Sequence, residues 1–155
     1  MKLFLIIMIM FSFFSCMDGP RAAFNNEFER ANPKVKLPYS NLIGMYVLDD
    51  DSKKRFHIQD TVKMDLQIKK DTSLVVNNYL DLNDRSLLNK SLQSKLYYIN
   101  DFESIYLGLF NHKISSSGSL GIYYRKKDRL LALYIYISPL KGQEHGDYLR
   151  YIKVK

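Results

Sequence analysis

The 155-residue chain has one cysteine, Cys16, no tryptophan and four prolines. A single cysteine excludes an intramolecular disulfide, so packing must stabilise the fold. The three histidines, His57, His112 and His145, lack the spacing of a metal site. The chain has no Gly-x-Ser-x-Gly motif and no phosphate-binding glycine loop, and Ser115–Gly118 has the composition of a turn. We therefore expect a protein that is not an enzyme and has no cofactor or metal.

No apolar run reaches the roughly 18 residues that a membrane-spanning helix needs. The longest one, Leu3–Phe14, follows Lys2 and ends at Ser15 and Cys16. A basic residue, an apolar run of this length and a small residue at its end predict a secretory signal peptide over residues 1–15. An ordinary cleaved signal with an incidental cysteine, and an uncleaved anchor helix, are the alternatives.

The tetrapeptide Phe13-Phe14-Ser15-Cys16 resembles the lipobox of bacterial lipoproteins, with Phe13 where Leu is preferred, as in lipoproteins of the Bacteroidota. The resemblance implies that Cys16 is acylated and becomes the mature N-terminus. Several acyl chains would hold the protein on a membrane. Some of these lipoproteins carry an acidic signal for surface exposure, whereas here only Asp18 follows the cysteine. We therefore expect the bacterial cell envelope, at the outer membrane and facing the periplasm.

The net charge of +7 arises from 23 basic and 16 acidic residues that are interspersed along the chain, which is typical of a solvated surface. Export makes nucleic acid an unsuitable partner. Residues 16–38 contain Gly19, three prolines and several asparagines, which predicts a flexible tether after the lipidated cysteine. Within it, Phe24–Ala31 is expected to form either a short helical turn or an unstructured linker.

One folded domain is expected over residues 39–155. Val62–Lys69 alternates apolar and polar residues at every step, which predicts a strand with one buried face. The three carboxylates in Asp49–Ser52 lack the spacing of a calcium loop and predict a solvated turn. Asn78–Ser94 is predicted to be a long loop, or a loop holding a short helix. The predicted strands are 41–48, 62–69, 73–77, 95–99, 104–110, 119–125, 130–137 and 147–154.

The connectors between these eight strands are too short and irregular for crossover helices. Turn residues separate the strands instead, so an antiparallel meander is expected. An all-β fold of this kind either closes into a barrel or packs as a sandwich.

The sequence Gly44-Met45-Tyr46 is similar to the Gly-x-Trp motif of lipocalin-like barrels, with Tyr46 in place of the Trp. The resemblance implies that Gly44 permits a close approach, that Tyr46 plugs the closed end of a barrel, and that Arg150 packs over Tyr46. The layout of signal, lipobox, tether and strands resembles small Bacteroidota lipoproteins with lipocalin-like domains.

Two binding hypotheses follow from the strand pattern. In the first, inward side chains line a cavity for a small apolar ligand. In the second, the barrel is solid and an outer face rich in tyrosine docks an envelope protein or glycan. The cavity candidates are Tyr46, Val62, Met64, Leu66, Ile68, Leu131, Leu133 and Ile135. The docking candidates are Tyr123, Tyr134 and Tyr136.

Overall fold

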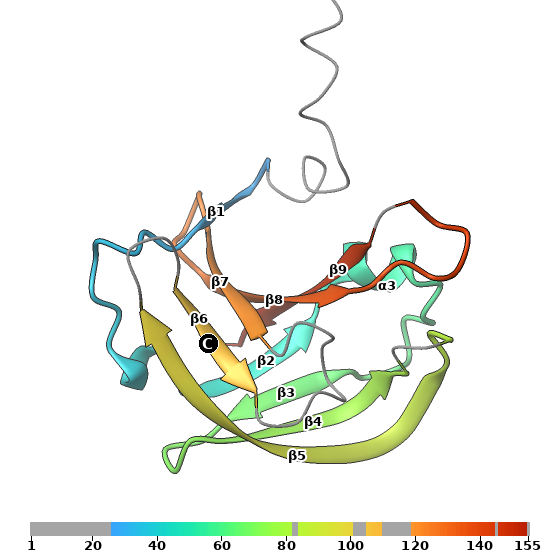
Figure 1. The fold of residues 1–155 in the computed structure, drawn as a ribbon, viewed down its shortest axis with the longest axis horizontal. Helices are drawn as coiled ribbons and strands as arrows, with labels where there is room; N and C mark the ends of the chain where they lie inside the picture. The colour runs from blue at the N-terminus through green and yellow to red at the C-terminus, as the bar shows by residue number, and fades with distance from the viewer. Residues whose placement is uncertain (1–25, 82–83, 101–104, 110–118, 145, 155) are drawn as a thin grey trace, which may run out of the picture.

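The structure, a computed structural model, describes residues 26–81, 84–100, 105–109, 119–144 and 146–154. Nine strands and two short helices make up the described part of the chain (Figure 1). The elements are β1 (Phe28–Arg30), the 3-10 helix η1 (Tyr39–Asn41), β2 (Gly44–Leu48), α3 (Asp50–Arg55), β3 (Asp65–Ile68), β4 (Ser73–Leu80), β5 (Leu87–Asn100), β6 (Ile105–Leu109), β7 (Ser119–Arg125), β8 (Leu131–Ile137) and β9 (Asp147–Lys153).

The nine strands form one sheet in which every pairing is antiparallel. From β2 to β9, each strand pairs with the next one along the chain, and β9 also pairs with β2. The short strand β1 pairs with β7. These pairings confirm the predicted all-β antiparallel fold, and each of the eight predicted strands is present.

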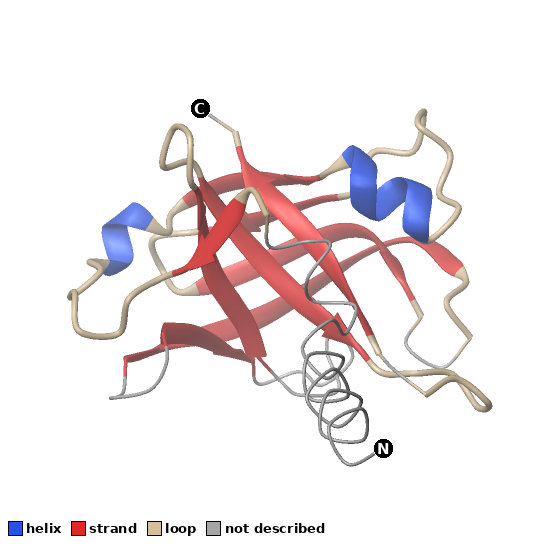
Figure 2. Cartoon of the chain, turned by 90° about the horizontal axis from the view of Figure 1, so that it is seen from above, coloured by secondary structure: helices blue, strands red, loops and turns tan. Residues whose placement is uncertain are grey.

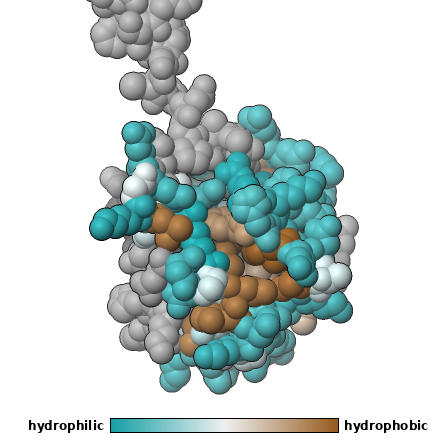
Figure 3. Space-filling model, turned by 90° about the vertical axis from the view of Figure 1, so that its right-hand side faces the viewer, coloured by the Kyte–Doolittle hydropathy of each residue, from teal (hydrophilic) through white to brown (hydrophobic). Residues whose placement is uncertain are grey.

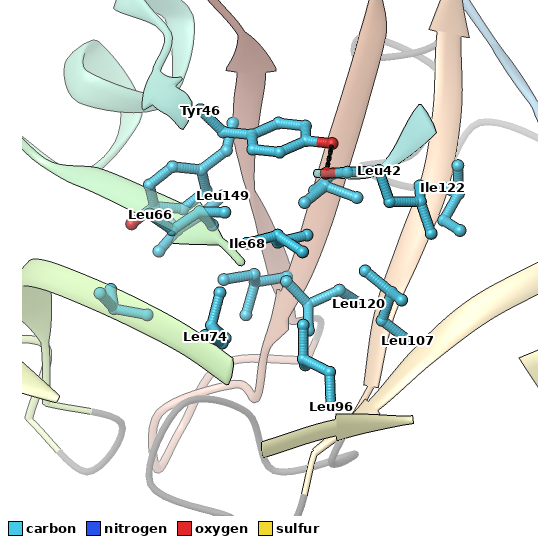
Figure 4. Packing of buried hydrophobic residues seen from close by; sticks show 14 of the residues in the cluster. Leu42, Tyr46, Leu66, Ile68, Leu74, Leu96, Leu107, Leu120, Ile122 and Leu149 are labelled. Atoms are coloured by element: carbon cyan, nitrogen blue, oxygen red, sulfur yellow. Dashed lines mark hydrogen bonds between the residues drawn. The ribbon is translucent and has the colours of Figure 1, made fainter. Parts of the chain in front are cut away.

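The alternation of apolar and polar residues decides which face of each strand is buried. In β3, Leu66 and Ile68 are buried whereas Gln67 is exposed. In β2, Tyr46 and Leu48 are buried by the same rule. The inner side chains of the strands meet in one hydrophobic cluster, part of which is shown in Figure 4.

Strand β8 differs from the others because both of its faces are buried, as its pattern of consecutive apolar residues allows. Leu133 belongs to the inner cluster. Ala132 and Tyr134 point the other way and pack with Phe28 of β1 in a second cluster. The outer face of β8 is therefore covered by the N-terminal strand.

Part of the predicted tether is folded, so the prediction for this segment is wrong. Phe28–Arg30 pairs with Tyr123–Arg125 of β7, and Phe28, Ala31 and Leu37 are buried. A segment of mixed polarity forms a strand here because its few apolar side chains meet an apolar outer face elsewhere in the chain. Periodicity over so few residues does not reveal this contact.

The predicted turn at Asp49–Ser52 is instead the start of α3. The side chain of Asp49 accepts a hydrogen bond from the Ser52 backbone N–H at 2.9 Å, which caps the helix. Two further carboxylates lie in the first turn and three basic residues, Lys53–Arg55, lie in the last, so the charges suit the helix dipole.

The predicted loop at Asn78–Ser94 is mostly strand, since β4 continues to Leu80 and β5 begins at Leu87. Ser91 of the predicted loop takes part in side-chain hydrogen bonds that cross the sheet. Asn77 Nδ2 donates to Asp65 Oδ1 at 2.8 Å, and Ser91 Oγ donates to Asn77 Oδ1 at 2.6 Å. The left-handed backbone of Asn78 (φ 50°) lies where the register between β4 and β5 shifts.

Candidate functional site

The predicted cavity residues are brought together in the inner cluster, where Val62 is half-buried and the other seven are buried. Tyr46, Met64, Leu66 and Leu133 have no exposed surface. Figure 4 shows side chains from opposite strands of the sheet pointing toward one another in this cluster. The central part of the interior is therefore packed by side chains.

The strands have two ends, and each end carries one of the helices (Figure 2). We call the first the η1 end; residues 31–43 and the β3–β4 and β7–β8 connectors form it. We call the second the α3 end; the β2–β3, β4–β5 and β8–β9 connectors form it, on the right of Figure 1. Because consecutive strands are antiparallel, alternate connectors return to the same end.

At the η1 end, the buried hydroxyl of Tyr46 donates a hydrogen bond to the Leu42 carbonyl oxygen at 2.6 Å, which is drawn in Figure 4. Burial raises the pKa of Tyr46 well above its ordinary value, so the hydroxyl stays protonated. The ammonium of Lys153 lies 5.9 Å from the centroid of the Tyr46 ring and donates to the Asn41 carbonyl oxygen at 2.6 Å. Burial lowers the pKa of Lys153.

The cation expected over Tyr46 was Arg150, and this prediction is wrong. Leu149 and Tyr151 of β9 belong to the inner cluster, so the intervening Arg150 points to the outer face. Lys153, which pairs directly with Tyr46 in the register, lies over the ring instead. Gly44 has a φ of 144°, and a Cβ there would meet the Lys153 side chain at 2.9 Å. The expected close approach at Gly44 is thus present, with a different partner.

Arg150 fastens α3 and β1 to β9. Its guanidinium forms ion pairs with Asp49 and Asp51, and its backbone N–H donates to Ser52 Oγ at 2.9 Å. Its central carbon also lies 4.3 Å from the centroid of the Phe28 ring. Arg150 and Asp49 are almost fully buried, with side chains 6% and 7% exposed, so the pair is largely desolvated.

The predicted docking face is not a free surface, because β1 covers its central residue. Tyr134 is 4% exposed, stacks on Tyr123 with ring centroids 4.0 Å apart, and meets Phe28 edge to face at 6.1 Å. Burial raises the pKa of Tyr134 to about 12, against the lowering effect of Arg150 beside it. Tyr136 is half-buried and its ring lies 5.3 Å from that of Tyr148. These tyrosines pack a second, outer core.

The α3 end carries partly buried apolar side chains over the inner cluster, as the η1 end does with Tyr39 and Tyr124. Four side chains of the α3 end, Phe56, Ile58, Val62 and Leu87, pack against the inner cluster and are only partly buried. Figure 3 views the molecule from this side and shows apolar side chains gathered in the middle of the face, with polar side chains around them. This arrangement offers an apolar molecule a surface that continues into the core.

Arg85 reaches over this apolar surface from the β4–β5 connector. Its central carbon lies 5.4 Å from the centroid of the Phe56 ring, and Nη2 donates to the Ser138 carbonyl oxygen at 3.2 Å. Its backbone is left-handed (φ 61°), and its N–H is held by the Asp81 carbonyl oxygen at 2.9 Å. Arg85 therefore bridges two connectors of the α3 end and lies beside a third.

The Nε atom of Arg85 is buried, and within the described residues it has no hydrogen-bond partner. No carboxylate of the described residues forms an ion pair with Arg85 either. The sequence gives no signal for this residue, because its importance depends on where the β4–β5 hairpin ends. Lys153, in contrast, lies on the same face of β9 as the inward Leu149 and Tyr151, because alternate residues of a strand share a face. Strand alternation alone would therefore have identified Lys153 as an inward residue.

A separate pocket of about 260 Å³ lies at the η1 end, beside the N-terminal segment. Ala31, Val35 and Leu37 line it together with Tyr124 and Arg129. The guanidinium carbon of Arg129 lies 4.6 Å from the centroid of the Tyr124 ring, and Arg129 forms an ion pair with Glu29. The cation here has a counter-ion, which Arg85 lacks among the described residues.

The remaining sequence candidates give no site. His57 is exposed, and Cys16, His112 and His145 lie outside the described residues. In the part of the chain that the structure describes, no group of three His, Cys, Asp or Glu side chains is placed to hold a metal ion. The same residues include no helix with the length and apolar character required to cross a membrane.

Comparisons with known proteins gave no match: no protein-family model fits the chain, and the searches of curated proteins and of solved structures found no similar protein.

Proposed function

We propose that this protein is a lipid-anchored lipoprotein of the bacterial envelope whose lipocalin-like barrel binds a small apolar molecule at the α3 end. The observation that carries the proposal is the partly buried apolar surface of Phe56, Ile58, Val62 and Leu87, which packs directly against the core. Apolar surface at the mouth of a β-fold is a common form of small-molecule site.

Two sets of pairings support a closed barrel in place of a sandwich. β9 pairs with both β8 and β2, and β7 pairs with both β6 and β8, so the series of neighbours returns to its first strand. A sandwich would divide the strands between two sheets, whereas here they share one. The Gly44, Tyr46 and Lys153 contacts at the η1 end support the lipocalin-like kind of barrel.

The anchor and its location rest on the sequence. The apolar run before Cys16 and the lipobox-like Phe13–Cys16 support acylation and export to the envelope, with the domain on the periplasmic side of the outer membrane. The binding role is non-catalytic in this proposal. The alternative, docking of an envelope protein or glycan through Tyr123, Tyr134 and Tyr136, loses support because Tyr134 is buried under β1.

Recovery of bound molecules tests the proposal. We expect the full-length protein, purified from its own membranes and analysed by native mass spectrometry and then by denaturing extraction, to release a reproducible apolar small molecule. The Val62→Glu variant should lose this molecule because a carboxylate at the half-buried α3 end penalises apolar contact. Val35→Glu is the matched control, since Val35 is 62% exposed at the η1 end.

Two outcomes would count against the function. One is a preparation without any apolar ligand beyond the membrane lipids recovered with an unrelated lipoprotein. The other is equal recovery from both variants, which would place the ligand elsewhere.

A further inference from the structure

Arg85 gives the α3 end a chemical preference that apolar surface alone does not provide. The buried Nε–H, unpaired within the described residues, lies on a guanidinium that stands 5.4 Å over the Phe56 ring. A buried donor without a partner is costly, and native structures rarely keep one without a reason. Here the guanidinium that carries the unused donor lies over the ring of Phe56, a partly buried residue packed against the inner cluster.

Asp81 and Asp84 lie in the same connector as Arg85, but no acidic group of the described chain forms an ion pair with it. Arg85 has no carboxylate partner there, and its one hydrogen bond from the guanidinium goes to a backbone carbonyl. Lys53, also at the α3 end, is 8% exposed and donates from Nζ to the Asp60 carbonyl oxygen at 3.0 Å. Both cations thus contact the connector that carries Phe56 and Ile58, and both do so through neutral groups.

Four other arginines in the described chain show the opposite pattern, whereas Arg30, which is exposed on β1, forms no ion pair with a described residue. Arg150, Arg129, Arg125 and Arg55 each pair with a carboxylate. Arg129 resembles Arg85 most closely, because it also has a left-handed backbone (φ 59°) and also lies over an aromatic ring. The difference between the two is the counter-ion, Glu29, which Arg129 has.

We infer that the ligand at the α3 end is an anionic amphiphile, with its apolar chain on Phe56, Ile58, Val62 and Leu87 and its carboxylate or phosphate on Arg85. A guanidinium offers paired N–H donors that fit an oxyanion in two-point geometry. An oxyanion beside Nε would satisfy the unused donor and supply the missing counter-charge. The inference rests on the proposed function and adds the chemical class of the ligand.

Photoaffinity labelling of the full-length protein in phosphatidylcholine nanodiscs tests this inference. The two probes are hexadecanoic acid and hexadecanol, each carrying a diazirine and a terminal alkyne. We expect saturable labelling of α3-end peptides by the acid at about tenfold lower concentration than by the alcohol, as one charge-assisted hydrogen-bonded pair would give. Competition by unlabelled dodecanoate or dodecyl phosphate then separates carboxylate from phosphate recognition.

The Arg85→Gln variant should lose the preference for the acid while labelling by the alcohol is kept. Arg85→Lys should retain part of the preference, because lysine keeps the positive charge but lacks the paired N–H donors of a guanidinium. Arg129→Gln is the matched control and should behave as the wild type. Far-UV circular dichroism and thermal melting of the same samples show whether each variant is folded.

The possible failures are distinguishable. An unchanged acid preference in Arg85→Gln, or equal labelling by acid and alcohol in the wild type, would overturn the anionic class while leaving apolar binding intact. Labelling that is not saturable with either probe would contradict the proposed function itself.

Discussion

The η1 end and the α3 end are closed by different chemistry. At the η1 end, Tyr46 and Lys153 direct their polar atoms to backbone carbonyls, and the pocket-lining Arg129 is paired with Glu29. At the α3 end, apolar side chains are only partly buried, and Arg85 lies over one of them, Phe56, with a buried donor unused by the described residues. Tyr98, beside Leu37 of the η1 end, also has a buried hydroxyl without a hydrogen bond to the described residues, so the α3 end is distinguished by an arginine without a counter-ion and not by an unused donor alone.

The largest effect is expected from Arg150→Met, which tests whether the α3 end depends on the ion pairs of Arg150 with Asp49 and Asp51. The substitution keeps the apolar stem but leaves Asp49 buried without its cation. We expect a loss of about 3–5 kcal/mol in the free energy of unfolding, measured by urea denaturation of the full-length protein. Arg55→Met breaks the more exposed pair with Asp147 and should cost less than about 1 kcal/mol. Similar losses of unfolding free energy in both variants would show that burial does not make the Arg150–Asp49 pair more important than the Arg55–Asp147 pair.

Tyr46→Phe should weaken the η1 end by an intermediate amount. It removes the hydroxyl that donates to the Leu42 carbonyl oxygen and leaves that buried acceptor unpaired. The expected loss is about 1–2 kcal/mol in the free energy of unfolding. Tyr39→Phe, at the same end, removes a longer and exposed bond to the Lys69 carbonyl oxygen (3.2 Å) and should cost less. An equal cost would show that closure of the η1 end does not depend on the buried bond.

The smallest effect concerns acid stability at the turn that carries Arg129. The hydrogen bond from Arg125, followed by a bond from the Leu130 N–H, lowers the pKa of Asp128 from an ordinary 3.8 to about 2. Since the folded pKa is depressed, this contribution to stability is present above about pH 4 and is lost as the pH falls through about 2. Asp128→Asn should therefore flatten the decline of the melting temperature over that interval.

The corresponding carboxylate at the α3 end is Asp84, whose pKa is lowered by hydrogen bonds from Ser86 instead of by a cation. Salt should therefore weaken the pH dependence due to Asp128 but leave that due to Asp84 nearly unchanged, because ion pairs are screened more than neutral hydrogen bonds. Melting curves of Asp84→Asn and Asp128→Asn at low and high salt make the comparison, and identical salt responses would contradict it.

The strands could be predicted from local pattern, while the parts that distinguish the two ends could not. Period-two alternation in Val62–Lys69 and apolar runs such as Leu131–Ile137 identified strands and inner faces correctly. Phe28 became a core residue only because it meets Tyr134, more than a hundred positions away in the chain. The same holds for Arg85, which reaches Ser138 across the sheet. Such contacts depend on register and on where hairpins end, which composition does not encode.

Asn78 and Asp49 show a second reason for error, which is that residues typical of turns also serve at the start of helices and inside strands. Asparagine and aspartate favour loops because their side chains bond to nearby backbone. In this protein the Asp49 side chain accepts from the Ser52 backbone N–H to begin a helix, and the Asn78 side chain donates from within β4 to the Lys63 carbonyl oxygen. Residue type alone does not distinguish these uses.

The short strand β1 also has a consequence for self-association. β8 pairs with one edge of β7. The other edge of β7 pairs with two strands, with β6 along Ser119–Gly121 and with β1 along Tyr123–Arg125. An uncovered strand edge is a template for pairing with a second chain. The three residues of β1, Phe28–Arg30, thus shield this edge of the sheet from edge-to-edge aggregation. A proteolytic cut beyond Ala31 would open that edge and expose the ring of Tyr134 in one step.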